Sequence, residues 1–326
     1  MNNENILEVS NLKTYFEIKE GIVKAVDGVN FKLRKGESLG LVGESGCGKT
    51  TTALSIIRLL TDNGFIEDGK IMFKEKNLAN LKEEEMLSTR WKEISMIFQG
   101  SMNALNPVMK ISDQIIEAIQ LHENKNEKDA RERVKELFEL VNLDVGLMDS
   151  YPHEFSGGMR QRAIIAMALA CNPSLIIGDE PTTALDVMVQ AQIIDLINSL
   201  RKKLDMSMII ITHDLSIITE TCDKIAVMYA GKIAEIGTVD DIVFRYKHPY
   251  TEKLIKAFPN IYGERKMVES IPGVPPNLLN PPEGCRFAAR CHKKIGKICE
   301  EVDPALEQLD SSEHMVACHL WGGKNE

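Results

Sequence analysis

The chain has 326 residues, of which 44% are hydrophobic and 27% are charged, the composition of an ordinary globular protein. Its net charge of -9 argues against a protein whose whole surface binds nucleic acid, although a local basic patch is compatible with this sum. The polar N-terminus lacks the apolar core of a secretory signal, and no apolar run approaches the ~20 residues that cross a bilayer. We therefore expect a cytoplasmic protein with one large domain or two ordinary ones.

The first hundred residues favour β-structure around one helix. Short strands are predicted at 6–9, 15–18, 29–33 and 38–42, with glycines as turn residues between them. The strand at 38–42 is apolar throughout, which is typical of a buried strand. A helix is expected at 49–60 and a further strand at 94–98.

The middle of the chain is helical, and regular alternation follows it. Apolar residues recur at helical spacing through residues 111–143, first at positions 111, 115, 116 and 119 and then at 134, 137, 138 and 141. Alternating strands and helices then predict an α/β fold with a mostly parallel sheet and helices on both faces. The expected strands are 175–177, 208–211, 225–229 and 232–236, and the expected helices are 188–203 and a short one after His213.

A phosphate-binding motif lies between the predicted strand at 38–42 and the helix that follows. Residues 43–50 read GESGCGKT and match the P-loop pattern G-x-x-x-x-G-K-[ST] in full. Its glycines let consecutive N–H groups turn around a polyphosphate, and the helix N-terminus adds positive potential. We expect Lys49 to reach the β- and γ-phosphates of ATP and the Thr50 hydroxyl to ligate Mg²⁺. The residues expected to bind nucleotide here are Gly43, Ser45, Gly46, Cys47, Gly48, Lys49, Thr50 and Thr51.

A second segment, LIIGDE at residues 175–180, complements the P-loop. An apolar strand that ends in a carboxylate places Asp179 beside Mg²⁺. Glu180 is expected to polarise a water molecule for attack on the γ-phosphate. Together with the P-loop, this segment indicates an ATP hydrolase.

Residues 155–162, FSGGMRQR, resemble the signature motif of ATP-binding-cassette (ABC) ATPases. The resemblance covers residues 5 to about 260. It implies a nucleotide-binding domain at 1–260 with a RecA-like core, an antiparallel β subdomain and an α-helical subdomain at about 100–160.

The same resemblance implies a role for further residues. Gln99 is similar to the Q-loop glutamine, which senses Mg²⁺ and the attacking water, and His213 to the switch histidine, which binds the γ-phosphate. Ser156, Gly157 and Gly158 would contact ATP held by the opposite subunit of a dimer. Asp186, in the D-loop, would link the two sites. Phe16, or less favourably Tyr15, would stack on adenine.

Segments near the C-terminus resemble one branch of that family, the ATPase subunits of bacterial dipeptide and oligopeptide importers. They are RYKHPYTEKL at 245–254, IPGVPP at 271–276 and GCRFAARC at 284–291. The resemblance implies a peripheral protein on the cytoplasmic face of the membrane, paired with a paralogous ATPase subunit or with itself. Two permease subunits and an extracytoplasmic peptide-binding protein would complete the importer, without nucleic acid. A nickel importer and a soluble ABC ATPase remain alternatives.

Four of the seven cysteines crowd into an extension at 261–326, after a Pro/Gly-rich connector at 271–284. Four neighbouring thiols in a cytoplasmic chain favour a metal site over two disulfides. Thiolates suit zinc or an iron–sulfur cluster, and the absence of a C-x2-C pair disfavours zinc. The resemblance implies a 4Fe–4S cluster, and Arg286 and Arg290 are among the cations that would offset its charge or be solvated. Its predicted ligands are Cys285, Cys291, Cys299 and Cys318.

Overall fold

The computed structural model describes residues 4–183, 185–257, 271–309 and 313–322. The chain forms two compact units, each assembled from separate stretches of sequence. Unit 1 comprises Met1–Ile6, Leu33–Ser38 and Asn80–Thr212, whereas unit 2 comprises Leu7–Lys32, Leu39–Ala79 and His213–Glu326. The domain boundary predicted near residue 260 lies outside the described residues.

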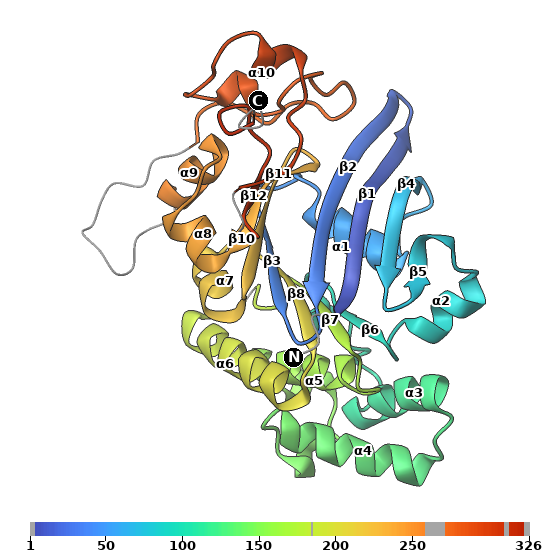
Figure 1. The fold of residues 1–326 in the computed structure, drawn as a ribbon. Coiled ribbons are helices and arrows are strands. Elements are labelled where there is room, and N and C mark those ends of the chain that lie inside the picture. Colours follow the sequence, from blue (N-terminus) through green and yellow to red (C-terminus); the bar gives the residue numbers. More distant parts are fainter. Residues whose placement is uncertain (1–3, 184, 258–270, 310–312, 323–326) are drawn as a thin grey trace. The chain divides into compact units, whose positions relative to one another are not determined.

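Unit 2 contains a four-stranded sheet of the order β2-β1-β4-β5 (Figure 1). Sequence patterns predicted short strands here, but β1 and β2 are each 14 residues long. Within β1, Asn11 has a positive φ of 50°. The pairing with β4 shifts register between Ser10 and Thr14, so the strand accommodates this residue as a β-bulge and continues. The strands are β1 (Asn5–Ile18), β2 (Gly21–Arg34), β4 (Gly64–Phe73) and β5 (Lys76–Asn77).

A second set of strands in unit 2 has the order β11-β12-β10-β9-β3. β3 runs parallel to β9, and β9, β10, β12 and β11 pair antiparallel in turn. The strands are β3 (Ser38–Val42), β9 (Lys224–Tyr229), β10 (Lys232–Thr238), β11 (Glu307–Gln308) and β12 (Met315–Val316). The chain's last strands therefore extend a sheet that begins with the buried β3.

In its described residues, unit 2 contains five α-helices. The helix predicted at 49–60 ends at Ile57, because Arg58 adopts a left-handed conformation with φ 52° and terminates it. The stretch 271–284 has neither helix nor strand, as its prolines and glycines predicted. The helices are α1 (Lys49–Ile57), α7 (Leu215–Thr221), α8 (Val239–Phe244), α9 (Pro249–Lys256) and α10 (Ile298–Glu301).

The part of unit 1 that the structure describes contains three parallel strands and five α-helices. β7 pairs with β6 on one side and with β8 on the other, both in parallel. The strands are β6 (Ile94–Ile97), β7 (Leu175–Asp179) and β8 (Ser207–Ile211). The helices are α2 (Glu83–Thr89), α3 (Ile111–Glu123), α4 (Glu127–Leu140), α5 (Gly157–Ala168) and α6 (Val187–Leu204).

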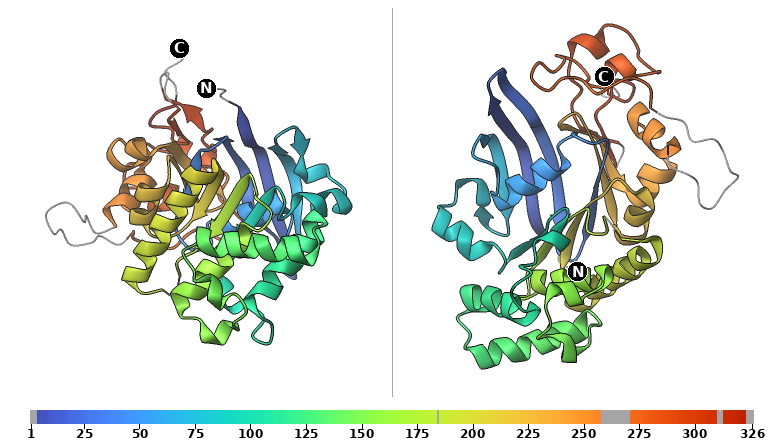
Figure 2. Two further views of the ribbon diagram at one scale, coloured as in Figure 1. Left: turned by 90° about the horizontal axis from the view of Figure 1, so that it is seen from below. Right: turned by 180° about the vertical axis from the view of Figure 1, so that it is seen from behind.

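The helical segment of unit 1 is held together by the apolar positions that the sequence predicted. α3, α4 and α5 pack on one another (Figure 2). Ile115, Val134, Leu137 and Phe138 are fully buried, so one face of each helix supplies the core. Asn126 begins α4 by accepting a hydrogen bond from the Asp129 backbone N–H at 2.9 Å.

A buried polar cluster joins the chain's end to β10 in unit 2. Glu235 of β10 is fully buried and accepts hydrogen bonds from the backbone N–H groups of Lys247 and His248, at 2.6 and 3.0 Å. His314 Nε2 lies 2.7 Å from the same carboxylate. His248 Nδ1 accepts from the Tyr250 N–H at 2.9 Å and so caps α9. Burial lowers the pKa of His248 to about 4, although Glu235 opposes this shift.

Replacing His248 by Asn is expected to weaken the dependence of stability on pH. The unfolded chain takes up a proton below the ordinary histidine pKa of 6.5, and the folded chain resists it down to about 4. Stability is therefore present above pH 6.5 and is lost as the pH falls towards 4, by up to about 3 kcal/mol. His248→Asn keeps a capping oxygen and removes the titration. Thermal unfolding followed by tryptophan fluorescence at pH 7.0, 5.5 and 4.5 measures this, and equal pH slopes for both proteins would contradict it.

Candidate nucleotide-binding and catalytic site

The P-loop of unit 2 follows β3 and is shaped by glycines with positive φ. Gly43 has φ 147°, and a Cβ there would lie 2.1 Å from the Met228 carbonyl oxygen. Gly48 has φ 104°, and a Cβ there would lie 2.5 Å from the Ala25 carbonyl oxygen. Both positions require glycine for conformation and for space. The loop backbone thus lies directly against β9 and β2.

The side chain of Lys49 folds back over the loop. Its Nζ donates hydrogen bonds to the carbonyl oxygens of Gly43 at 2.8 Å and Glu44 at 3.0 Å. Cys47 beside it is buried, and this burial raises the pKa of its thiol. Cys47 is therefore a packing residue with an unreactive thiol.

The P-loop fits a polyphosphate ligand. The first turn of α1, residues 49–52, carries no acidic side chain, and its N-cap is Gly48, so the positive end of the helix faces outward uncompensated. Ser45, Gly46 and Thr50 are exposed at the mouth of the loop, while Thr51 is half-buried. A Cβ at Gly46 would meet nothing within 4 Å, which leaves the loop's crest open. The backbone N–H groups and the Lys49 ammonium group are donors suited to phosphate oxygens, and the Thr50 hydroxyl oxygen is a ligand type suited to Mg²⁺.

In unit 1, the ends of two neighbouring parallel strands bring Gln99 and Glu180 together. β6 and β7 run side by side, so the residues that follow them meet at one edge of the sheet. Gln99 Nε2 donates a hydrogen bond to Glu180 Oε2 at 3.0 Å. Thr183 Oγ1 donates to the same oxygen at 2.9 Å. The sequence prediction missed Thr183, whose only signal was its position three residues after Glu180.

The backbone around Glu180 is equally constrained. Asp179, the last residue of β7, is buried. Glu180 has φ 48°, a rare conformation for a side chain of its size, and its N–H donates to the Ile211 carbonyl of β8 at 2.8 Å. The buried Gln161 side chain donates to the Pro181 carbonyl and fixes the turn that follows. Strain of this kind is concentrated at functional sites, and here it turns the Glu180 carboxylate towards Gln99.

Ser156 and Asp186 each begin a helix of unit 1. Ser156 Oγ accepts a hydrogen bond from the Met159 N–H at 3.3 Å and caps α5. Asp186 Oδ1 accepts from the Val189 N–H at 3.0 Å and caps α6. Gly157 and Gly158 form the first turn of α5, where two N–H groups point outward from a helix N-terminus.

The remaining predicted residues belong to unit 2. His213 is exposed and lies two residues before α7, next to its N-cap residue Asp214. The Tyr15 hydroxyl donates to Asp27 at 2.9 Å, and its ring packs edge-on against Phe65. Phe16 packs against Gly64, where a Cβ would approach its ring to 2.7 Å. Tyr15 is thus engaged by polar and aromatic contacts within the unit.

The iron–sulfur cluster predicted from the late cysteines is wrong. Among the described residues, which include all four of these cysteines, no group of three or more His, Cys, Asp and Glu side chains is arranged to hold a metal ion. The same finding removes the zinc alternative. Burial raises the pKa of Cys285 to about 11 and also raises that of Cys291 and Cys318, so these groups are thiols at neutral pH.

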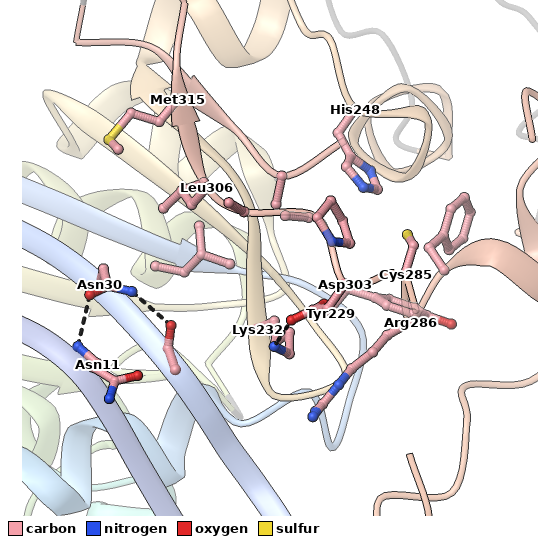
Figure 3. A pocket seen from close by; sticks show the side chains of 17 residues that line it. Asn11, Asn30, Tyr229, Lys232, His248, Cys285, Arg286, Asp303, Leu306 and Met315 are labelled. Atoms are coloured by element: carbon pink, nitrogen blue, oxygen red, sulfur yellow. Dashed lines mark hydrogen bonds and ion pairs between the residues drawn. The ribbon is translucent and has the colours of Figure 1, made fainter. Parts of the chain in front are cut away.

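The surroundings of Cys285 show how this part of the chain is held instead. Cys285 lines a cavity of about 560 Å³ together with Tyr229, His248 and Arg286 (Figure 3). Arg286 was predicted to offset the charge of a cluster or to be solvated, but its side chain is 4% exposed and pairs with Asp27. Lys232 and Asp303 form a further ion pair beside the cavity. Packing and ion pairs therefore hold the segment that contains Cys285, Arg286 and Asp303.

Comparison with known families agrees with these features. The family model of ABC transporters matches residues 26–183. The family model of the oligopeptide/dipeptide transporter C-terminal region matches residues 234–299. The dipeptide transport ATP-binding protein DppD of Bacillus subtilis is 47% identical over 320 residues, which are 97% of this chain and 95% of that protein.

The chain belongs to the ATP-binding proteins of ABC transporters. Within this family it resembles the oligopeptide transport ATP-binding protein OppD of Escherichia coli, with 45% identity over 93% of this chain and 90% of that protein. The chain is an ATPase, as the family and the names of its relatives indicate. Neither DppD nor OppD is described by its name as an iron–sulfur protein.

Solved structures confirm the ABC fold predicted from the sequence. The ATP-binding cassette MJ0796, a dimer in a post-hydrolysis state with ADP and Pi, has a TM-score of 0.64 with this chain at 25% identity. The match covers 72% of this chain and 98% of that one. CbiO1 of Clostridium perfringens, at 26% identity, has a TM-score of 0.63 over 73% and 90% of the two chains.

Among the described residues, no helix combines the length and apolar character needed to span a membrane.

Replacing Gly158 by Ala is expected to destabilise unit 1. A Cβ at Gly158 would lie 2.7 Å from Val189 Cγ1 of α6, whereas a Cβ at Gly157 would meet Leu185 Cδ2 at 3.7 Å. Gly158→Ala should therefore cost about 1–3 kcal/mol of stability. Gly157→Ala, the matched control, should stay within about 1 kcal/mol of the wild type.

A double variant tests whether the contact with Val189 causes the loss of stability in Gly158→Ala. Val189→Ala removes the atom that a methyl group at position 158 would strike, so Gly158→Ala with Val189→Ala should recover part of the lost stability. Urea or thermal unfolding measures all four proteins. An equal loss for both glycine variants would contradict the steric explanation.

Proposed function

We propose that this chain is the ATP-hydrolysing subunit of a membrane importer for dipeptides or oligopeptides. The observation that carries the proposal is the nearly full-length similarity to dipeptide and oligopeptide transport ATP-binding proteins, including a match at residues 234–299 to their C-terminal region. The cassette alone is common to many transporters, so the C-terminal region supports peptides as the substrate class.

The chain's residues divide the chemistry of hydrolysis. Lys49 and the N–H groups of residues 43–50 would bind the phosphates, and Phe16 would stack on adenine, since Tyr15 is engaged by Asp27. Thr50, Gln99 and Asp179 would ligate Mg²⁺, which supplies charge neutralisation when bound. Glu180 would accept the proton of the attacking water, and His213 would contact the γ-phosphate. The hydrogen bond between Gln99 and Glu180 supports this assignment of the base.

Hydrolysis would be coupled to transport through a dimer. In this proposal a paralogous ATPase subunit, or a second copy of this chain, closes against it head-to-tail. Ser156, Gly157 and Gly158 would then present the N-terminus of α5 to ATP held by the partner, with Asp186 linking the two sites. The pair would lie on the cytoplasmic face of the membrane, bound to two permease subunits that receive peptide from an extracytoplasmic binding protein.

Replacing Glu180 by Gln is expected to abolish turnover and leave ATP binding intact. The amide keeps the shape of the carboxylate and a hydrogen-bond acceptor for Thr183, but it cannot take a proton from water. The rate of phosphate release at saturating MgATP should fall at least ~100-fold. Glu117→Gln, an exposed position on α3, is the control and should hydrolyse at the wild-type rate. Hydrolysis by Glu180→Gln at the wild-type rate would show that another group is the base.

The substrate class is tested in the assembled importer. Co-expression with the permease, partner ATPase and binding-protein subunits of a peptide importer from the same organism should give ATP-dependent uptake of a radiolabelled dipeptide or oligopeptide. Glu180→Gln in the same assembly should abolish that uptake. Uptake of Ni²⁺ without uptake of peptide would overturn the peptide assignment and leave the ATPase assignment standing.

A further inference from the structure

Glu44, the second residue of the P-loop, is held by three separate contacts within unit 2. Its carboxylate forms a two-pronged ion pair with Arg290, with Oε2 2.6 Å from Nη1 and Oε1 3.0 Å from Nη2. Its backbone N–H donates to Tyr250 Oη at 2.9 Å. Its carbonyl accepts from Lys49 Nζ at 3.0 Å. Tyr250 and Arg290 lie 206 and 246 positions further along the chain.

The guanidinium of Arg290 is itself fixed on several sides. Nε donates to the Pro272 carbonyl at 2.8 Å and Nη2 to the Ile271 carbonyl at 3.1 Å. Nη1 donates to Tyr229 Oη at 3.1 Å, and the side chain is only 4% exposed. The ion pair with Glu44 raises the pKa of Arg290 further. Arg290 is therefore a permanent cation locked in one position.

The contact with Tyr250 is equally rigid. Tyr250 is fully buried, and burial raises the pKa of its hydroxyl, which stays protonated. Its ring packs against Tyr229 and Phe287, with centroids 4.6 and 5.3 Å away. Phe287 lies three residues before Arg290, so one aromatic cluster supports Arg290 and Tyr250, two of the three groups that contact Glu44.

The charges explain why such a clamp matters for ATP. The P-loop attracts a polyphosphate with N–H groups and Lys49, and a carboxylate within the same loop opposes that attraction. A two-pronged guanidinium contact is the strongest way for a side chain to neutralise a carboxylate. Without Arg290, the negative charge of Glu44 would stand uncompensated within the loop that binds the phosphates.

We propose that Arg290 is a positioning residue for ATP binding, which fixes the Glu44 carboxylate and neutralises its charge, so that this carboxylate does not repel a phosphate group at the P-loop. The segment after residue 270 thereby sets the affinity of the nucleotide site. This inference rests on the proposed function only in so far as the P-loop binds ATP. Arg290 would affect the affinity for ATP and would not affect the chemical step.

The test measures the affinity of the full-length protein for a fluorescent N-methylanthraniloyl derivative of MgATP. Arg290→Gln should raise Kd about tenfold, the size expected for one uncompensated charge near the ligand. The kcat of ATP hydrolysis at saturating ATP should change less than about twofold, so that KM carries the effect. Arg290→Lys keeps the charge and loses the two-pronged geometry, so its Kd should lie between those of the wild type and Arg290→Gln.

A charge-removal variant separates neutralisation from mere support of the fold. Glu44→Gln in the Arg290→Gln background should return Kd to within about threefold of the wild type, because no uncompensated carboxylate remains. Lys293→Gln is the matched control, since it removes a cation near Arg290 in sequence that pairs with Glu252 of α9. This control should bind ATP as the wild type does.

The outcomes are distinct. An unchanged Kd in Arg290→Gln, or a double variant as weak as Arg290→Gln, would overturn the inference. Should Arg290→Gln fail to fold, Glu44→Gln alone decides: it should bind at least as tightly as the wild type, and a Kd weaker by about tenfold would overturn the inference. Failure of the wild type to bind the ATP derivative would instead refute the proposed function.

Discussion

The phosphate loop depends on two α-carbons that have no room for a side chain. At Gly43 and Gly48, the loop backbone runs so close to the carbonyl groups of Met228 and Ala25 that a methyl group would overlap them. Both residues also adopt positive φ, so conformation and space impose the same choice. Because of this close approach, the P-loop packs directly against β9 and β2. It also explains why the segments around residues 229, 250 and 290, which pack together at the end of β9, can reach Glu44.

In unit 1, the ends of two parallel strands position Gln99 and Glu180, the residues to which catalytic roles are proposed. β6 and β7 end at the same edge, and the rare backbone conformation of Glu180 turns its carboxylate towards Gln99. Gln99 and Thr183 share one carboxylate oxygen, which fixes the orientation of the group. A displacement of the end of β6, which carries Gln99, would therefore change the hydrogen bond that orients the Glu180 carboxylate. That is a physical basis for the glutamine's predicted role as a sensor.

Much of the fold and of the site was predictable because its signals are local. The P-loop is contiguous, the apolar spacing in α3 and α4 places their core residues correctly, and an apolar strand leads directly to Asp179 and Glu180. Long-range pairing was not predictable. Arg286 and Arg290 lie among the cysteines in sequence and were assigned to them, but their partners Asp27 and Glu44 are 259 and 246 positions away. The four cysteines were assigned to a metal site because they are close in sequence, and to a 4Fe–4S cluster because of the family resemblance. Proximity along the chain does not set the directions of the thiols.

The packing of the segment after residue 270 explains how it is held in place, since its described residues form no metal site. Phe287 is 1% exposed and makes ring contacts with Tyr229 and Tyr250, while Val316 of β12 is buried and pairs with Glu235 of β10. The segment needs no core of its own, because these anchors join it to the core of unit 2. The same aromatic cluster supports Arg290 and Tyr250, two of the three groups that hold Glu44. One packed cluster therefore contributes both to the order of the C-terminal segment and to the position of Glu44 in the P-loop.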